Sequence, residues 1–140
     1  MSENYQLIEN EDYWILPLED KPVCRFLVDS QLTIEFLEPE SERTIIVIGG
    51  EFNLEIDSKE YVLSAEKPTT LGPVFALYRA TVASALAFKS GRLEVRFAEG
   101  AKISATPHSD FESWHVTGAR GLCVVCRPGG DLAIWKPEPL

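Results

Sequence analysis

The stretch TIIVIGGEFNLEID, residues 44–57, contains the two patterns that decide the fold. TIIVI, residues 44–48, is an unbroken apolar run, which is typical of a β-strand covered on both faces. Gly49 and Gly50 then turn the chain. From residue 51 onward apolar and polar residues alternate, so Phe52 and Leu54 face a core while the residues between them face solvent.

The same period of two extends in both directions along the chain. Residues 24–36 predict a hairpin in which Ile34 faces inward and Glu35 outward. Residues 78–105 predict a three-stranded meander. Within it, alternation would place Val82, Leu86 and Phe88 on the same face of one strand. About nine or ten short strands with turns every 8–12 residues predict a mostly β fold, either an antiparallel sandwich or a partly open barrel.

One segment departs from this alternation. Leu71, Phe75 and Tyr78 recur at helical spacing, with a threonine at position 69 or 70 available as N-cap. The sequence therefore predicts one short helix near residues 69–78. We find no linker and no internal repeat, so residues 1–140 are interpreted as a single β-rich domain.

Charge is distributed unevenly along the chain. The net charge is −9. Residues 1–60 contain 15 acidic and 4 basic residues, and residues 61–140 contain 7 acidic and 9 basic residues, so the halves carry −11 and +2. Such a chain repels phosphate backbones, which argues against nucleic acid as a partner, and it attracts cationic proteins.

The sequence also bears on location. No apolar run approaches the ~20 residues of a membrane span, and the N-terminus lacks the basic and apolar regions of a signal peptide. Three cysteines without framework spacing favour free thiols in a reducing compartment. The sequence therefore predicts a cytoplasmic protein that does not bind membranes.

The pair Cys123 and Cys126 has the spacing C-x-x-C of redox and metal sites. The neighbours are β-formers, however, and in a strand positions i and i+3 point to opposite faces, with Cα atoms about 10 Å apart. That separation exceeds what a disulfide spans. We interpret Cys126 as a core residue beside Leu122 and Val124, and we predict no metal site and no cofactor.

Other chemistry-bearing residues give weak signals. His115 lies between Trp114 and Val116 and is expected to face outward, and His108 lies in a polar connector. There is no G-x-S-x-G elbow and no phosphate-binding glycine loop, so we predict no catalytic residue. The tryptophans at positions 14, 114 and 135 are interpreted as core residues first and as interface residues second, which leaves a homodimer open.

The C-terminal part of the chain resembles a known family. The residues that carry the resemblance are Trp114, Val116, Gly118, Gly121, Val125, Cys126, Pro128, Gly129, Gly130, Ala133 and Trp135. Together they read W-x-V-x-G-x-x-G-x-x-x-V-C-x-P-G-G-x-x-A-x-W, which is similar to the signature of an uncharacterised family of small bacterial proteins, a domain of unknown function. The resemblance implies structural turns and strand ends, supplies no catalytic residue, and favours proteins of the immunity type.

The sequence thus leads to a working hypothesis with two alternatives. We expect a non-enzymatic, acidic domain that binds a basic protein partner, as an immunity or antitoxin-like inhibitor does. The alternatives are a small-ligand-binding β-barrel or an unrecognised enzyme, and a homodimer with a structural role. The expected partner-binding residues are the carboxylates of the charged loop and of the following strand: Glu38, Glu40, Glu42, Glu51, Glu55 and Asp57.

Overall fold

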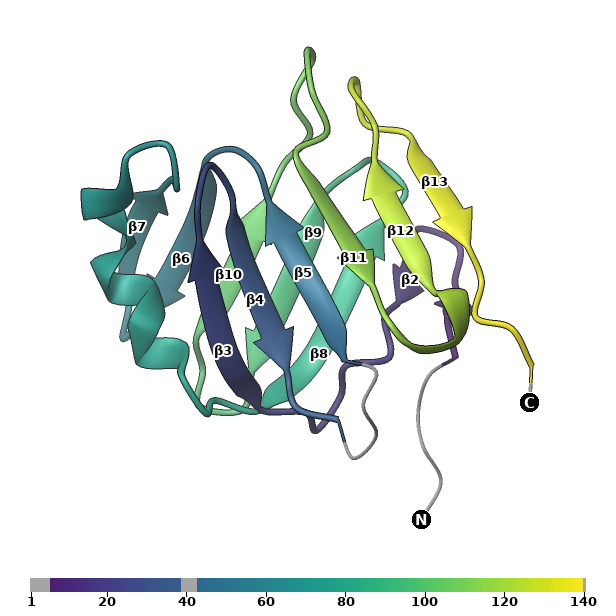
Figure 1. Cartoon of the computed structure of the whole chain (residues 1–140), viewed down its shortest axis with the longest axis horizontal. Coiled ribbons are helices and arrows are strands. Elements are labelled where there is room, and N and C mark those ends of the chain that lie inside the picture. The colour runs from purple at the N-terminus through teal and green to yellow at the C-terminus, as the bar shows by residue number, and fades with distance from the viewer. Residues whose placement is uncertain (1–5, 39–42, 140) are drawn as a thin grey trace.

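The computed structural model describes residues 6–38 and 43–139 and consists of two antiparallel sheets packed face to face (Figure 1). We call the seven-stranded sheet, in the order β1-β2-β8-β9-β10-β6-β7, the back sheet. The six-stranded sheet, in the order β13-β12-β11-β5-β4-β3, is the front sheet and lies nearer the reader in Figure 1. The mostly β, sandwich-like architecture is confirmed, and the sheets do not close into a barrel.

The described residues contain thirteen strands rather than nine or ten, because several are only two to four residues long. Their bounds are β1 Ile8–Glu9, β2 Tyr13–Ile15, β3 Val23–Val28, β4 Leu32–Phe36, β5 Thr44–Ile48, β6 Phe52–Ile56, β7 Lys59–Leu63, β8 Val82–Phe88, β9 Leu93–Phe97, β10 Lys102–Ala105, β11 Trp114–Thr117, β12 Cys123–Cys126 and β13 Leu132–Trp135. Two 3₁₀ helices are also present among the described residues: η1 Pro68–Leu77, between β7 and β8, and η2 Ala119–Gly121, between β11 and β12.

The core lies between the two sheets. The inward positions predicted by the alternation are buried, including Ile34 and Phe36 from the front sheet and Leu54 and Val95 from the back sheet. Trp114 is the largest of the fully buried side chains. Burial of these apolar side chains between two layers is the main driving force for the fold.

Gly49 and Gly50 join two strands that belong to different sheets. β5, before them, pairs with β4 and β11 of the front sheet, whereas β6, after them, pairs with β7 and β10 of the back sheet. The chain therefore crosses from one sheet to the other at this glycine pair.

The predicted helix forms, but as a 3₁₀ helix with a different buried face. Leu71, Val74 and Leu77 are buried, whereas Phe75 and Tyr78 are 46% and 52% exposed. A 3₁₀ helix has three residues per turn, so its core-facing side chains recur every third position. In Figure 1, η1 lies at the left between β7 and β3 and covers one open side of the sandwich.

In the second half of β8, the side chains face the opposite way from the prediction. An irregularity in the pairing between Val82 and Ser84 shifts the register, so Val82 and Ala85 are buried while Leu86 lies on the outer face. A bulge inserts one residue into a strand and reverses the faces that follow it. The alternation in the sequence does not reveal this because Leu86 and Phe88 are themselves apolar.

Candidate functional site

The carboxylates predicted to bind a partner are spread over the structure. Glu38 forms an ion pair with Lys21 at 2.6 Å, and its side chain is only 9% exposed. Glu55 lies 3.7 Å from Lys102, its neighbour across the β6–β10 pair. Glu51 is exposed and immediately precedes β6. The hypothesis also named positions 40 and 42, which lie outside the described residues.

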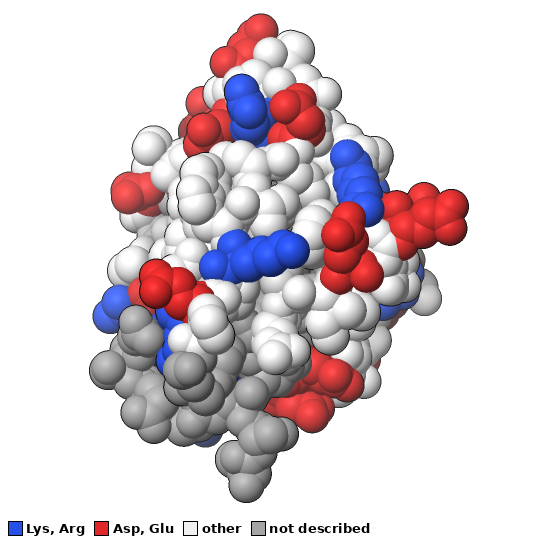
Figure 2. Space-filling model, turned by 90° about the vertical axis from the view of Figure 1, so that its right-hand side faces the viewer, with Lys and Arg blue, Asp and Glu red and all other residues white. Residues whose placement is uncertain are grey.

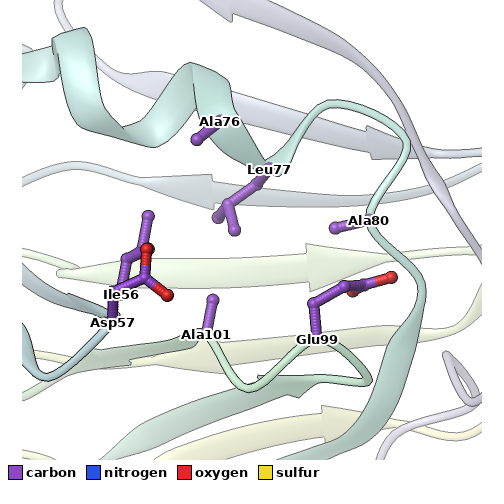
Figure 3. A pocket seen from close by; sticks show the side chains of 7 residues that line it. All are labelled: Ile56, Asp57, Ala76, Leu77, Ala80, Glu99 and Ala101. Carbon is purple, nitrogen blue, oxygen red and sulfur yellow. The ribbon is translucent and has the colours of Figure 1, made fainter.

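Asp57 differs from these because it lines a pocket. It is exposed in the tight turn between β6 and β7, with a φ of 53°. The pocket has a volume of about 220 Å³ and is lined by Ile56, Asp57, Ala76, Leu77, Ala80, Glu99 and Ala101. These residues come from the end of η1 and from the turns that follow β6 and β9 (Figure 3).

The lining of the pocket combines an apolar floor with two acidic groups. In Figure 3, Asp57 and Glu99 lie on either side, with Leu77 and Ala101 between them. Within the described part of the chain, neither carboxylate has an ion-pair partner. The guanidinium of Arg79, which follows η1, lies instead over the ring of Tyr78, 5.4 Å from its centroid. Sequence analysis missed Glu99 because it lies far from Asp57 along the chain.

The pocket is smaller than a typical site for a small molecule. Sites for small molecules and cofactors occupy about 300–1,000 Å³. A volume of about 220 Å³ with an open mouth fits one long side chain more closely than a cofactor. Between the two sheets, the described residues form one cluster of buried apolar side chains.

The two late cysteines lie on opposite faces of β12, as predicted. Cys126 is fully buried beside Val124, and its thiol lies 3.3 Å from the carbonyl oxygen of Gly91. Cys123 lies on the outer face, opposite Trp135. All three cysteines are free thiols. Burial raises the pKa of both Cys123 and Cys126, which disfavours the reactive thiolate.

The histidines do not form a shared site. His108 is exposed, stacks on Phe111 at 3.8 Å, and accepts a hydrogen bond at Nδ1 from the backbone N–H of Asp110. His115 faces outward from β11, and burial by its neighbours lowers its pKa, although Glu112 opposes this shift. Across the described ranges, no three His, Cys, Asp or Glu side chains are grouped so as to hold a metal ion.

A second candidate surface is the outer face of the front sheet, which we call the neutral face. One row of outward residues crosses all six strands and consists of Leu27, Thr33, Val47, His115, Val125 and Ala133. The next row consists of Arg25, Glu35, Ile45, Thr117, Cys123 and Trp135. No described helix or strand lies over these rows (Figure 1).

Glu35 faces outward on the neutral face, as predicted, yet little of it is accessible to solvent. It is 7% exposed, because Arg25 lies over it and approaches its carboxylate at 2.7 Å. A second guanidinium, from Arg43, lies 4.0 Å away. The charge of this row is therefore neutralised within the chain.

The outer face of the back sheet has the opposite character. Glu94 is bracketed by Arg92 and Arg96, each at 3.0 Å, and Lys102 lies directly across from Arg96. Such alternating ion pairs are typical of a solvated sheet surface. On the side formed by β13 and the C-terminal segment, acidic and basic side chains are likewise interspersed around uncharged surface (Figure 2).

The C-terminal signature has a structural role. Gly91, in the β8–β9 turn, accepts a hydrogen bond from the indole N–H of Trp114 at 2.9 Å. Gly130, in the β12–β13 turn, packs directly against Gly91, because a Cβ on Gly91 would lie 2.6 Å from the Gly130 carbonyl oxygen. With Cys126, these contacts tie a back-sheet turn to the front sheet. The predicted core role holds for Trp14 and Trp114, but Trp135 is 56% exposed.

The fold thus defines an antiparallel β-sandwich with one side covered by a 3₁₀ helix. A family model described as a family of unknown function, DUF6188, matches residues 14–136. The chain therefore belongs to this family, and the match extends well beyond the C-terminal signature. No curated protein and no solved structure matches the chain. No helix in the described ranges is long and apolar enough to cross a membrane.

Proposed function

We propose that this chain is a non-enzymatic protein-binding domain that recognises a basic partner by taking one Lys or Arg side chain into the Asp57–Glu99 pocket. The observation that carries the proposal is the combination of an apolar floor with two carboxylates that form no ion pair with any other described residue. A long cationic side chain buries its methylene stem on apolar surface while its charged end stays near acidic groups. The pocket supplies both surfaces.

Charge supports the same kind of partner over a longer range. The net charge of −9 raises the local concentration of cationic proteins and accelerates encounter with them. Exposed carboxylates outside the pocket, such as Glu51, contribute to this attraction. Long-range attraction selects basic partners, and the pocket then fixes one side chain of the partner in place.

Such binding acts by occlusion. When the partner binds at the pocket, this domain covers the docked surface of the partner. An inhibitor of the immunity or antitoxin type works in this way without catalysis. Nothing in this mechanism requires a metal, a cofactor or a covalent step. The cytoplasm, where free thiols such as those of this chain persist, is the proposed location.

The test is to map where a cationic side chain binds. Amide resonances of the protein are followed by NMR during titration with N-acetyl-arginine amide, and N-acetyl-norleucine amide serves as the uncharged control. We expect shifts confined to Ala76, Leu77, Glu99 and Ala101 with the arginine derivative, decreasing as salt is raised. Shifts scattered over the surface, or equal shifts with both compounds, would refute the proposal.

A further inference from the structure

The two faces of the apolar run 44–48, which forms β5, have different surroundings. Ile46 and Ile48 are buried against the back sheet, as expected for the inner face of β5. Ile45 and Val47 belong to the neutral face. No second layer of the described chain lies over this face, although Val47 is itself only 6% exposed. A sequence typical of a strand buried on both faces therefore has a layer on only one of them.

The neutral face also lacks the charges that keep a sheet surface solvated. Its rows contain a single acidic side chain, Glu35, and that carboxylate is held by Arg25 at 2.7 Å. At its margins lie exposed apolar side chains, with Leu27 46% and Trp135 56% accessible. Depletion of charge together with exposed aromatic and aliphatic side chains characterises the central part of protein interfaces.

We propose that the neutral face binds the neutral face of a second copy of this chain, forming a symmetric dimer of stacked sheets. The remainder of each copy is acidic, so a basic protein would be attracted to other surfaces. A second copy presents the same rows, in which the paired Arg25 and Glu35 are the only Asp, Glu, Lys or Arg residues. A two-fold axis places each row against its own equivalent, as in any isologous interface. Sheets that stack in this way lie about 10 Å apart.

The area of the neutral face determines the affinity that we expect for the dimer. Six strands spaced about 4.8 Å apart and about five residues long make a surface of roughly 29 Å by 17 Å. Two copies then bury on the order of 1,000 Å², at the lower limit for a specific interface. We therefore expect a reversible dimer with a dissociation constant in the micromolar range.

The affinity of this dimer is expected to depend on salt in a characteristic way. Each copy carries a net charge of −9, so the copies repel each other outside the neutral face. Added salt screens that repulsion and strengthens the dimer. Binding of a basic partner at the pocket is expected to weaken with salt. Because the two salt dependences are opposite, the dimer and the pocket can be tested separately.

The test is sedimentation equilibrium of the full chain over a hundredfold range of concentration, at low and high NaCl. Thr117→Glu introduces a charge at a central strand of the neutral face, and Trp135→Glu does so at a position that is already 56% exposed and therefore tolerates the change in the monomer. Asn53→Glu is the matched control, because it adds the same charge to an exposed strand position on the outer face of the back sheet.

We expect the wild type and Asn53→Glu to dimerise alike and more tightly at high salt. Thr117→Glu and Trp135→Glu should weaken the dimer by at least about tenfold, since like charges would meet across the interface. A wild type that stays monomeric at every concentration and both salts would overturn the proposal. So would a dimer that neither neutral-face variant weakens.

Discussion

Trp114 donates its indole N–H to the carbonyl oxygen of Gly91 at 2.9 Å, and this buried hydrogen bond links the front sheet to a turn of the back sheet. Both residues are at the centre of a contact that also includes Gly130 and Cys126. Three residues of the C-terminal motif, Trp114, Cys126 and Gly130, therefore help to hold the two sheets together.

Substitution of Gly91 tests the close approach of the two turns. Gly91 has a φ of 104°, and an added Cβ would lie 2.6 Å from the Gly130 carbonyl oxygen. We expect Gly91→Ala to lower the free energy of unfolding by about 3 kcal/mol or more, from backbone strain and steric overlap together. Urea denaturation gives the value.

Gly100→Ala is the matched control for that substitution. Gly100 has a nearly equal φ of 101°, but no atom lies within 4 Å of an added Cβ. It should therefore show only the strain component, about 1–2 kcal/mol. Equal losses of stability in the two variants would contradict the packing of the two turns.

The hydrogen bond itself is tested by Trp114→Phe. Loss of the donor and of part of a buried ring should lower the free energy of unfolding by about 2–4 kcal/mol. Trp135→Phe, at a position that is 56% exposed, should change it by less than about 0.5 kcal/mol. Both are measured in dilute protein so that self-association does not contribute, and a larger loss in the Trp135 variant would refute the assigned burial.

Thiol labelling tests the divergence of Cys123 and Cys126. Under native conditions we expect Cys123 to be alkylated slowly and Cys126 to be protected until the protein unfolds, because Cys126 is fully buried and burial raises the pKa of both thiols. Mass spectrometry of peptides from the labelled protein identifies the modified residue. A disulfide between these two residues, or equal labelling of both, would be incompatible with the strand geometry.

His115 predicts a specific dependence of stability on pH. Burial lowers the pKa of His115 in the folded state, so the unfolded chain binds the proton more readily. The stability contributed by the neutral ring is therefore complete above the ordinary histidine pKa of about 6.5 and is lost as pH falls toward the lower pKa of the folded state.

The comparison is between the wild type and His115→Gln in urea denaturation from pH 7.5 to pH 5. The wild type should lose more stability than the variant over this range. His108→Gln is the control, because His108 is exposed in a connecting loop. An identical slope in wild type and His115→Gln would show that the ring is not buried as described.

Sequence reasoning predicted the layered β architecture because side-chain alternation directly reports which face of a strand is buried. It predicted the opposite orientations of Cys123 and Cys126 for the same reason. It did not predict that the chain changes sheets at Gly49 and Gly50, because a turn signal does not specify which strand the next one pairs with. It placed Glu35 on the outer face but did not predict its low exposure, because the guanidinium that covers it comes from a neighbouring strand.

The candidate pocket was only half predictable. Asp57 belongs to the acidic stretch that the sequence emphasised, but Glu99 comes from a distant turn, and the apolar floor includes Leu77 from η1. Bringing these together depends on the pairing of β10 with both β6 and β9, a long-range arrangement that local patterns do not encode. The ion pairs of Glu38 with Lys21 and of Glu55 with Lys102 were likewise not predicted from the sequence.

The central claim is that Asp57 and Glu99 together recognise a cationic side chain, and it is tested most directly by the dissociation constant of N-acetyl-arginine amide. Asp57→Asn keeps a residue type that tolerates the positive φ of this turn, and Glu99→Gln retains the size of the side chain. The account predicts a constant on the order of 1 mM for the wild type and at least about tenfold weaker binding for the double variant. Equal affinities in the two proteins would contradict it.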